Sequence, residues 1–82
     1  MSLVRKHSIT IRGHRTSFSL EQPFMDALRD IAAERGLSLA ALIAEVDALR
    51  TREANLSSAL RVFVLREAQG SAARQADAAS SG

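Results

Sequence analysis

The chain is 82 residues long, with 46% hydrophobic residues, no cysteine and a formal net charge of +2. So short a chain usually needs disulfides, a metal or a partner chain to stabilise its core. Disulfides are excluded, and His7 and His14, the only histidines, belong to no cluster with metal-ligand spacing. We therefore expect a homodimer without a metal or a cofactor.

The sequence also argues against an enzyme and against a membrane protein. It has no cysteine nucleophile, no paired carboxylates in an apolar setting and no phosphate-binding glycine loop. No apolar run approaches the length that spans a bilayer, and charged residues come too early for a signal peptide. We expect a non-enzymatic, cytoplasmic protein.

Positive charge is concentrated at the N-terminal end. Residues 1–20 hold Arg5, Lys6, Arg12 and Arg15 and no acidic residue, whereas all 9 carboxylates lie at Glu21 or later. A basic segment of this kind attracts phosphate groups. It is the expected contact surface for a nucleic acid.

Two short strands are expected near this end. Residues 7–11 alternate polar with β-branched apolar side chains, and residues 16–20 alternate again after a basic connection. Because successive side chains of a strand point to opposite faces, Phe18 and Leu20 share one face of the second strand. The other face carries Ser17, Ser19 and Glu21. Whether residues 8–11 fold back on residues 16–20 as a hairpin, giving a four-stranded sheet in a dimer, stays open.

A first helix is predicted over residues 22–35. Pro23 suits its first turn, and Gly36 is a natural C-terminal stop. Ser38 then caps a second helix, whose apolar stripe comprises Leu39, Leu42, Ile43, Val46 and Leu49.

A third helix is expected to begin near Asn55 or Ser57, and it is apolar nearly all round through residue 65. Such a surface indicates burial at a subunit contact. Residues 69–82 lack large apolar side chains, so we expect a disordered tail. The expected dimer core is Phe18, Leu20, Leu28, Ile31, Leu42, Ile43, Val46 and Phe63.

The strand Arg15-Thr16-Ser17-Phe18-Ser19-Leu20-Glu21, the helix opening at Pro23 and the segment Arg35-Gly36-Leu37-Ser38-Leu39 together resemble the ribbon-helix-helix family of bacterial DNA-binding proteins. The resemblance covers residues 15 to about 50. It implies a mainly α protein with a short β-ribbon, in which the strand pairs antiparallel with that of a second subunit in an intertwined homodimer. The expected organisation is a basic arm or first hairpin strand over 1–14, a domain with an extra helix over 15–68, and the tail.

In such proteins the ribbon enters the major groove of double-stranded DNA. The resemblance places Ser17, Ser19 and Glu21 against the bases. Phosphates would be bound by the start of the second helix and by the basic segment, that is by Ser38, Leu39, Ala40, Arg5, Lys6, Arg12 and Arg15.

Two functions follow from these features. The first is a sequence-specific DNA-binding protein that regulates transcription. The second is an antitoxin-type or adaptor-type module that binds a partner protein through the apolar third helix, whose surface exceeds what docking on one subunit requires.

Overall fold

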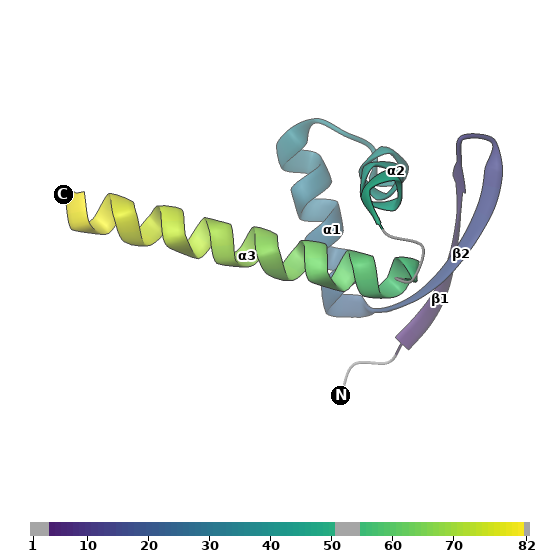
Figure 1. Cartoon of the computed structure of the whole chain (residues 1–82), viewed down its shortest axis with the longest axis horizontal. Coiled ribbons are helices and arrows are strands. Elements are labelled where there is room, and N and C mark those ends of the chain that lie inside the picture. The colour runs from purple at the N-terminus through teal and green to yellow at the C-terminus, as the bar shows by residue number, and fades with distance from the viewer. Residues whose placement is uncertain (1–3, 51–54, 82) are drawn as a thin grey trace.

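The computed structural model describes the backbone of residues 4–50 and 55–81 and the side chains of residues 4–50 and 55–70. A β-hairpin precedes three helices (Figure 1). The elements are β1 (Val4–Ile11), β2 (His14–Glu21), α1 (Gln22–Arg35), α2 (Leu39–Leu49) and α3 (Leu56–Ser81). The expected mainly α fold with a short β-ribbon is confirmed.

The ribbon forms within one chain. β1 and β2 pair antiparallel, with Val4 opposite Glu21 and Ile11 opposite His14. The two residues between them, Arg12 and Gly13, have φ angles of 52° and 81°. Positive φ at both central positions gives the turn whose twist matches that of two antiparallel strands. Residues 8–11 therefore do fold back on residues 16–20 as a hairpin. Because β2 already has a partner strand in its own chain, one reason for expecting a dimer is removed.

The helices begin and end where local signals predict. α1 has Pro23 in its first turn, and Gly36 follows it in the left-handed conformation with its N–H bonded to the carbonyls of Ala32 and Ala33. At the start of α2, the Ser38 hydroxyl accepts a hydrogen bond from the Ala41 N–H at 3.1 Å. Asn55 Oδ1 does the same for the Ser58 N–H at 2.8 Å, so Asn55 rather than Ser57 caps α3.

The core is closed by side chains of a single chain. Of the eight residues predicted for a dimer core, only Ile31 and Phe63 are partly exposed. The other six are buried, together with Ile11, Met25, Ala32, Leu56 and Leu60. Their burial therefore requires no second copy. The third helix contributes Leu56 and Leu60 to this core but leaves Val62 and Leu65 about half exposed.

The C-terminal segment differs from the expectation. Residues 69–81, predicted to be a disordered tail, continue α3 as helix to Ser81, projecting away from the other elements (Figure 1). Alanine, glutamine and arginine have high helix propensity, so a helix that is already started extends through such a segment without core contacts.

Candidate nucleic-acid interface

The hairpin has one face against the helices and one face open to solvent. On the inner face, Phe18 and Leu20 are buried, and the rings of His7 and Phe18 stack with centroids 5.4 Å apart. On the outer face, the hydroxyls of Ser8 and Ser17 lie 3.4 Å apart. The predicted alternation of the second strand therefore holds, and its polar side chains share an outer face with those of β1.

The outer face is polar, with cations among exposed hydroxyl side chains. Arg15, Ser17 and Ser19 are exposed along β2. Opposite them on β1 lie Thr10, Ser8 and Lys6, also exposed. Sequence reasoning named Lys6 only as part of a basic arm and missed Ser8 and Thr10. The polar residues at every second position of β1 are the sequence signal that could have placed all three on this face.

Glu21 lies at the end of the outer face and is held by α3. The Arg61 Nε donates to Glu21 Oε1 at 2.9 Å. A hydrogen bond from the backbone, together with that from Arg61, lowers the pKa of Glu21 below its usual value. The carboxylate is thus paired with a cation, which offsets the repulsion that a free acidic group would exert on phosphates. Arg61 was not predicted from the sequence, since it lies 40 residues from Glu21.

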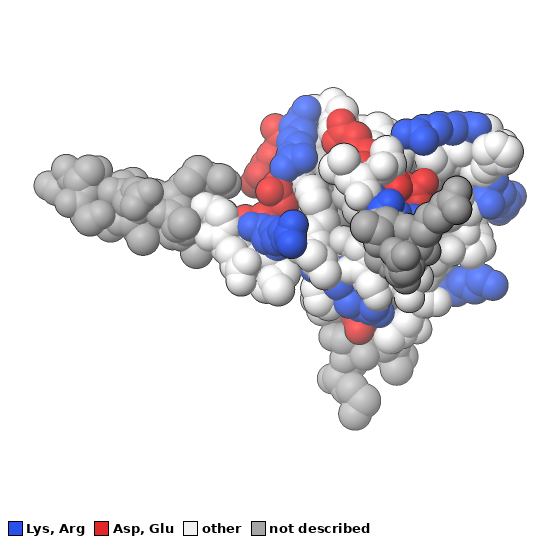
Figure 2. All heavy atoms as spheres, viewed as in Figure 1, with Lys and Arg blue, Asp and Glu red and all other residues white. Residues whose placement is uncertain are grey.

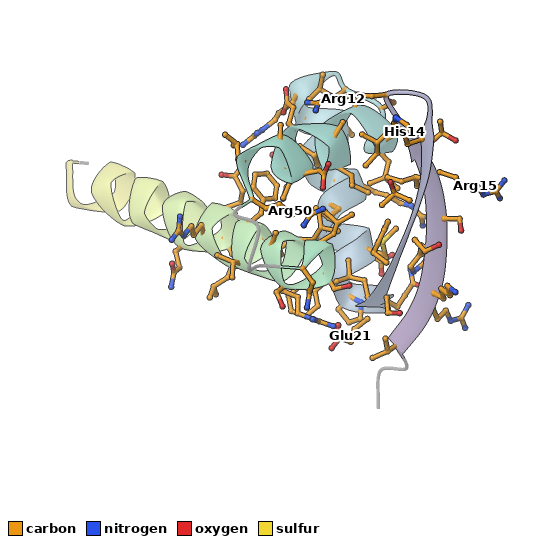
Figure 3. All side chains as sticks on the ribbon, turned by 45° about the vertical axis from the view of Figure 1, so that its right-hand side comes forward. Arg12, His14, Arg15, Glu21 and Arg50 are labelled. Carbon is orange, nitrogen blue, oxygen red and sulfur yellow. The ribbon has the colours of Figure 1, made fainter. Side chains whose placement is uncertain are left out.

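The predicted cations spread around the hairpin. Figure 2 shows Lys and Arg side chains along the right-hand side, over the hairpin, with the Asp and Glu side chains of that view mostly over the helices. In Figure 3, Arg15 extends away from the strands, while Arg12 extends from the turn toward α2. Arg5 is exposed but opposite Leu20, so it belongs to the helix-facing side of β1. The structure thus brings Lys6 and Arg15 to the outer face and leaves Arg5 and Arg12 at its margins.

The start of α2 has free hydrogen-bonding capacity. Ser38 is exposed, and its hydroxyl accepts from Ala41. The N–H groups of Leu39 and Ala40 are in the first turn, where a helix supplies no backbone acceptor. A phosphate contact at Ser38, Leu39 and Ala40 stays a prediction.

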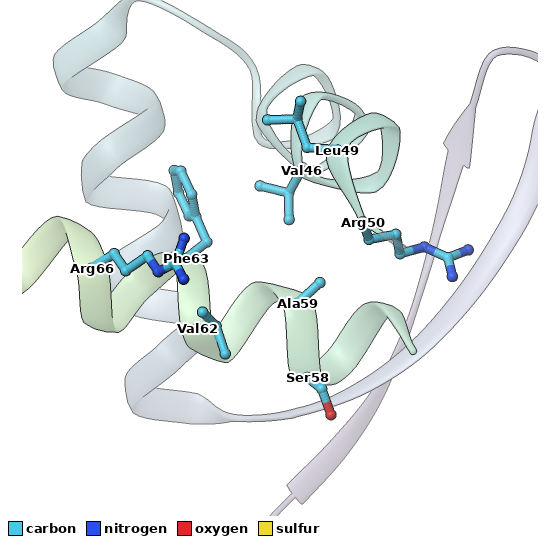
Figure 4. Close-up of a pocket in the computed structure, with 8 residues that line it drawn as sticks. All are labelled: Val46, Leu49, Arg50, Ser58, Ala59, Val62, Phe63 and Arg66. Carbon is cyan, nitrogen blue, oxygen red and sulfur yellow. The ribbon is translucent and has the colours of Figure 1, made fainter. Parts of the chain in front are cut away.

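A second surface feature is a groove between the end of α2 and the first turns of α3 (Figure 4). Its volume is about 430 Å³. The lining includes Leu49, which is 86% exposed, and Val62, which is 48% exposed. Arg50 and Arg66 also line the groove, and Arg50 is paired with a carboxylate, its Nε donating to Asp47 Oδ1 at 2.6 Å.

Comparison with known proteins identifies the family of the chain. No curated protein and no solved structure matches the chain. No helix among the residues that the structure describes is long and apolar enough to cross a membrane. A family model described as a ribbon-helix-helix domain matches residues 4–68, a span that includes the hairpin, α1, α2 and the part of α3 up to residue 68. That family is a DNA-binding, non-enzymatic one, and its match supports a DNA-binding or regulatory role in general. Since the matched span covers most of the chain, the protein belongs to the ribbon-helix-helix family.

Proposed function

We propose that the protein binds double-stranded DNA through the outer face of its hairpin and regulates transcription by doing so. The observation that carries this proposal is the composition of that face, where Lys6 and Arg15 stand among exposed hydroxyl side chains and the single carboxylate, Glu21, is paired with Arg61. The major groove is about 12 Å wide and admits a two-stranded ribbon. A hairpin supplied by one chain meets that requirement.

The residues on the face divide into two roles. Lys6 and Arg15 would neutralise phosphates, which gives affinity without sequence preference. The hydroxyls of Ser8, Ser17 and Ser19 can donate to or accept from base edges, and so would contribute the sequence preference. Glu21, which was expected to read bases, is instead engaged with Arg61, and this favours a supporting role at the end of the ribbon.

The test is fluorescence anisotropy on labelled random-sequence duplex DNA across a salt series. The double variant Lys6→Ala/Arg15→Ala removes two charges from the outer face, while Arg29→Ala/Arg66→Ala removes two exposed charges from the helices. We expect the first variant to bind more weakly and to lose about 0.9 from the log–log salt slope for each phosphate contact removed. The second should keep the slope of the unmodified protein.

Two results would count against the proposal. Equal losses in the two variants would mean that net charge alone drives binding, without a particular face. Absence of binding at low salt would remove the DNA-binding role altogether. Selection from a random duplex library, repeated with Ser17→Ala, then measures whether the hydroxyls read sequence, since a lost base contact changes the preference at one position of the site.

The groove between α2 and α3 favours a second candidate function, an adaptor-type or antitoxin-type module. An apolar floor with exposed Leu49 and Val62 is suited to the apolar face of a helix from another protein. A pull-down with Leu49→Asp as the negative control tests it. Loss of a captured partner on this substitution, with DNA binding unchanged, would support this function beside the first.

A further inference from the structure

The two strands of the hairpin repeat one pattern of side chains. Residues 5–11 read RKHSITI and residues 14–20 read HRTSFSL, and the two segments align position by position without a gap. Most aligned pairs have the same chemistry, whether cationic, hydroxyl or apolar. These pairs are Lys6 with Arg15, Ser8 with Ser17, Ile9 with Phe18, Thr10 with Ser19 and Ile11 with Leu20. The other two pairs, Arg5 with His14 and His7 with Thr16, are polar in both segments.

The exposure of the side chains follows the same repeat. In both segments the first, second, fourth and sixth residues are exposed, the third is partly buried and the seventh is buried. Only the fifth position differs, because Ile9 is partly buried and Phe18 is buried. Residues that match in the sequence therefore also match in their surroundings. The repeat is a property of the folded hairpin as well as of the sequence.

The register of the hairpin relates the two segments by an approximate two-fold axis. The residues that lie opposite one another on the outer face are Lys6 and Ser19, Ser8 and Ser17, and Thr10 and Arg15. A two-fold rotation about an axis perpendicular to this face, passing between Ser8 and Ser17, therefore brings Lys6 onto Arg15. The hydroxyls of the two serines, 3.4 Å apart, lie beside the axis. A single chain thus presents an outer face that is nearly symmetric.

The symmetry belongs to the outer face and not to the edges of the hairpin, because α3 covers the edge of β2. The Ser57 hydroxyl accepts a hydrogen bond from the Ser19 N–H at 3.1 Å. Two residues further along β2, Glu21 is bonded to Arg61. Leu60 is fully buried, so this part of α3 is anchored in the core. α3 therefore holds β2 from the side and leaves the repeated side chains of the outer face exposed.

Double-stranded DNA has two-fold axes of its own. Because its two strands run antiparallel, an axis that enters through the major groove relates one strand to the other. When a symmetric protein surface shares this axis, equivalent side chains meet equivalent groups of the two DNA strands. They meet the same bases only where the DNA sequence is an inverted repeat.

We propose that a single hairpin, supplied by one chain, reads an inverted repeat within one stretch of major groove. Ser8 and Ser17 are then equivalent specificity-determining residues, one on each side of the centre of the repeat. Lys6 and Arg15 stand at diagonally opposite corners of the face, so each contacts a phosphate of a different DNA strand. The inference rests on the proposed DNA binding and adds the symmetry of the target and the role of β1.

A substitution of one serine separates this symmetry from that of two chains bound side by side. If the axis lies within one chain, Ser8→Ala removes a contact from one half of the site, and Ser17 still reads the other half. If the axis relates two chains, each chain carries the substitution, and both halves of the site change alike. The symmetry of the site that the variant selects therefore distinguishes the two cases, whatever number of chains is bound.

Selection of binding sites from a random duplex library by the full chain is the test. We expect an inverted repeat for the unmodified protein and, for Ser8→Ala, an asymmetric site with the preference lost in one half. Ser17→Ala should select the same asymmetric site in the opposite orientation. On the inverted repeat, either variant should bind about five-fold more weakly, as expected for one lost hydrogen bond. The control Ser58→Ala removes an exposed serine of α3 and should still select the inverted repeat.

Three results overturn the inference and leave the proposed DNA binding in place. A site that stays symmetric in Ser8→Ala, changed in both halves, would assign the symmetry to two chains. A changed preference in Ser17→Ala but not in Ser8→Ala would mean that β2 alone reads the bases. Salt-dependent binding without any preferred sequence would show that the hydroxyls read no bases. Absence of binding at low salt would instead remove both the DNA binding and the inference.

Thermal unfolding followed by circular dichroism verifies that the variants are folded. Ser8 and Ser17 are both exposed, so replacing either by alanine should change the Tm little. A changed preference in a variant with an unchanged Tm then reports the lost contact with the DNA.

Discussion

Replacing Leu60 by alanine tests whether α3 is part of the folded domain or an appendage to it. The Leu60 side chain is completely buried in the core that the hairpin and the three helices share. Truncating such a leucine costs about 2–5 kcal/mol, because transfer energy is lost and a cavity remains. A domain of this size has a total stability of roughly 5–10 kcal/mol. At a loss of about 3 kcal/mol, the Tm should fall by roughly 12–24 °C.

The chain offers a matched control on the same helix. Leu65 is 55% exposed, so Leu65→Ala should change the free energy of unfolding by about 0.5 kcal/mol or less. Urea and thermal unfolding followed by circular dichroism compare the two variants with the unmodified protein. A loss below about 1 kcal/mol in Leu60→Ala would show that α3 does not unfold with the domain, and the cover over the β2 edge would lose its support. Equal losses in the two variants would mean that the exposed side of α3 is covered in solution.

Three further changes have defined outcomes. Ser38→Ala removes the cap of α2 and should lower the free energy of unfolding by about 1 kcal/mol in urea melts. Gly13→Ala forces a Cβ into the left-handed region at φ 81° and should cost about 1–2 kcal/mol, measured in the same way, although the space around it is open. The backbone hydrogen bond and Arg61 lower the pKa of Glu21 from 4.5, so its contribution to stability is complete above that pH and is lost as the pH falls through the lowered pKa. Glu21→Gln should therefore show a smaller fall in Tm on acidification below pH 4.5 than the unmodified protein, and an equal fall would contradict the assignment.

The helix boundaries were predictable because their signals are local. Pro23 in the first turn and Gly36 after the last one bound α1 at the residues expected from the sequence. The Ser38 cap of α2 has the same origin, since its hydroxyl bonds a backbone group only three residues away. Propensity and capping act within one or two helical turns, so a short window of sequence contains the information.

The partner of β2 was not predictable in the same way. Alternation of polar and apolar side chains shows that a segment is a half-buried strand, but it does not show whether the pairing strand lies in the same chain. The turn signal was also weak, because Arg12 takes a positive φ that asparagine or glycine adopts more readily. The sequence therefore left the hairpin open as one alternative, and the structure decided for it and with it placed Ser8 and Thr10 on the outer face.

Contacts between residues far apart in the sequence could not be predicted from the sequence. The bond between Ser19 and Ser57 and the ion pair of Glu21 with Arg61 join residues 38 and 40 positions apart. Neither pair follows from a repeat or a motif, since each depends on how α3 crosses β2. These contacts change the interpretation of Glu21, and they make one edge of the ribbon different from the other.

The two-residue turn also limits how the hairpin can change in length. Side chains alternate between faces with a period of two, so inserting a single residue into β1 would exchange the faces of every residue before it. Lys6 and Ser8 would then meet the helices, while His7 and Ile9 would be exposed to solvent. Inserting two residues would keep each side chain on its own face. Length variation in the regular ladder of this hairpin therefore keeps every side chain on its own face only when it comes in even steps.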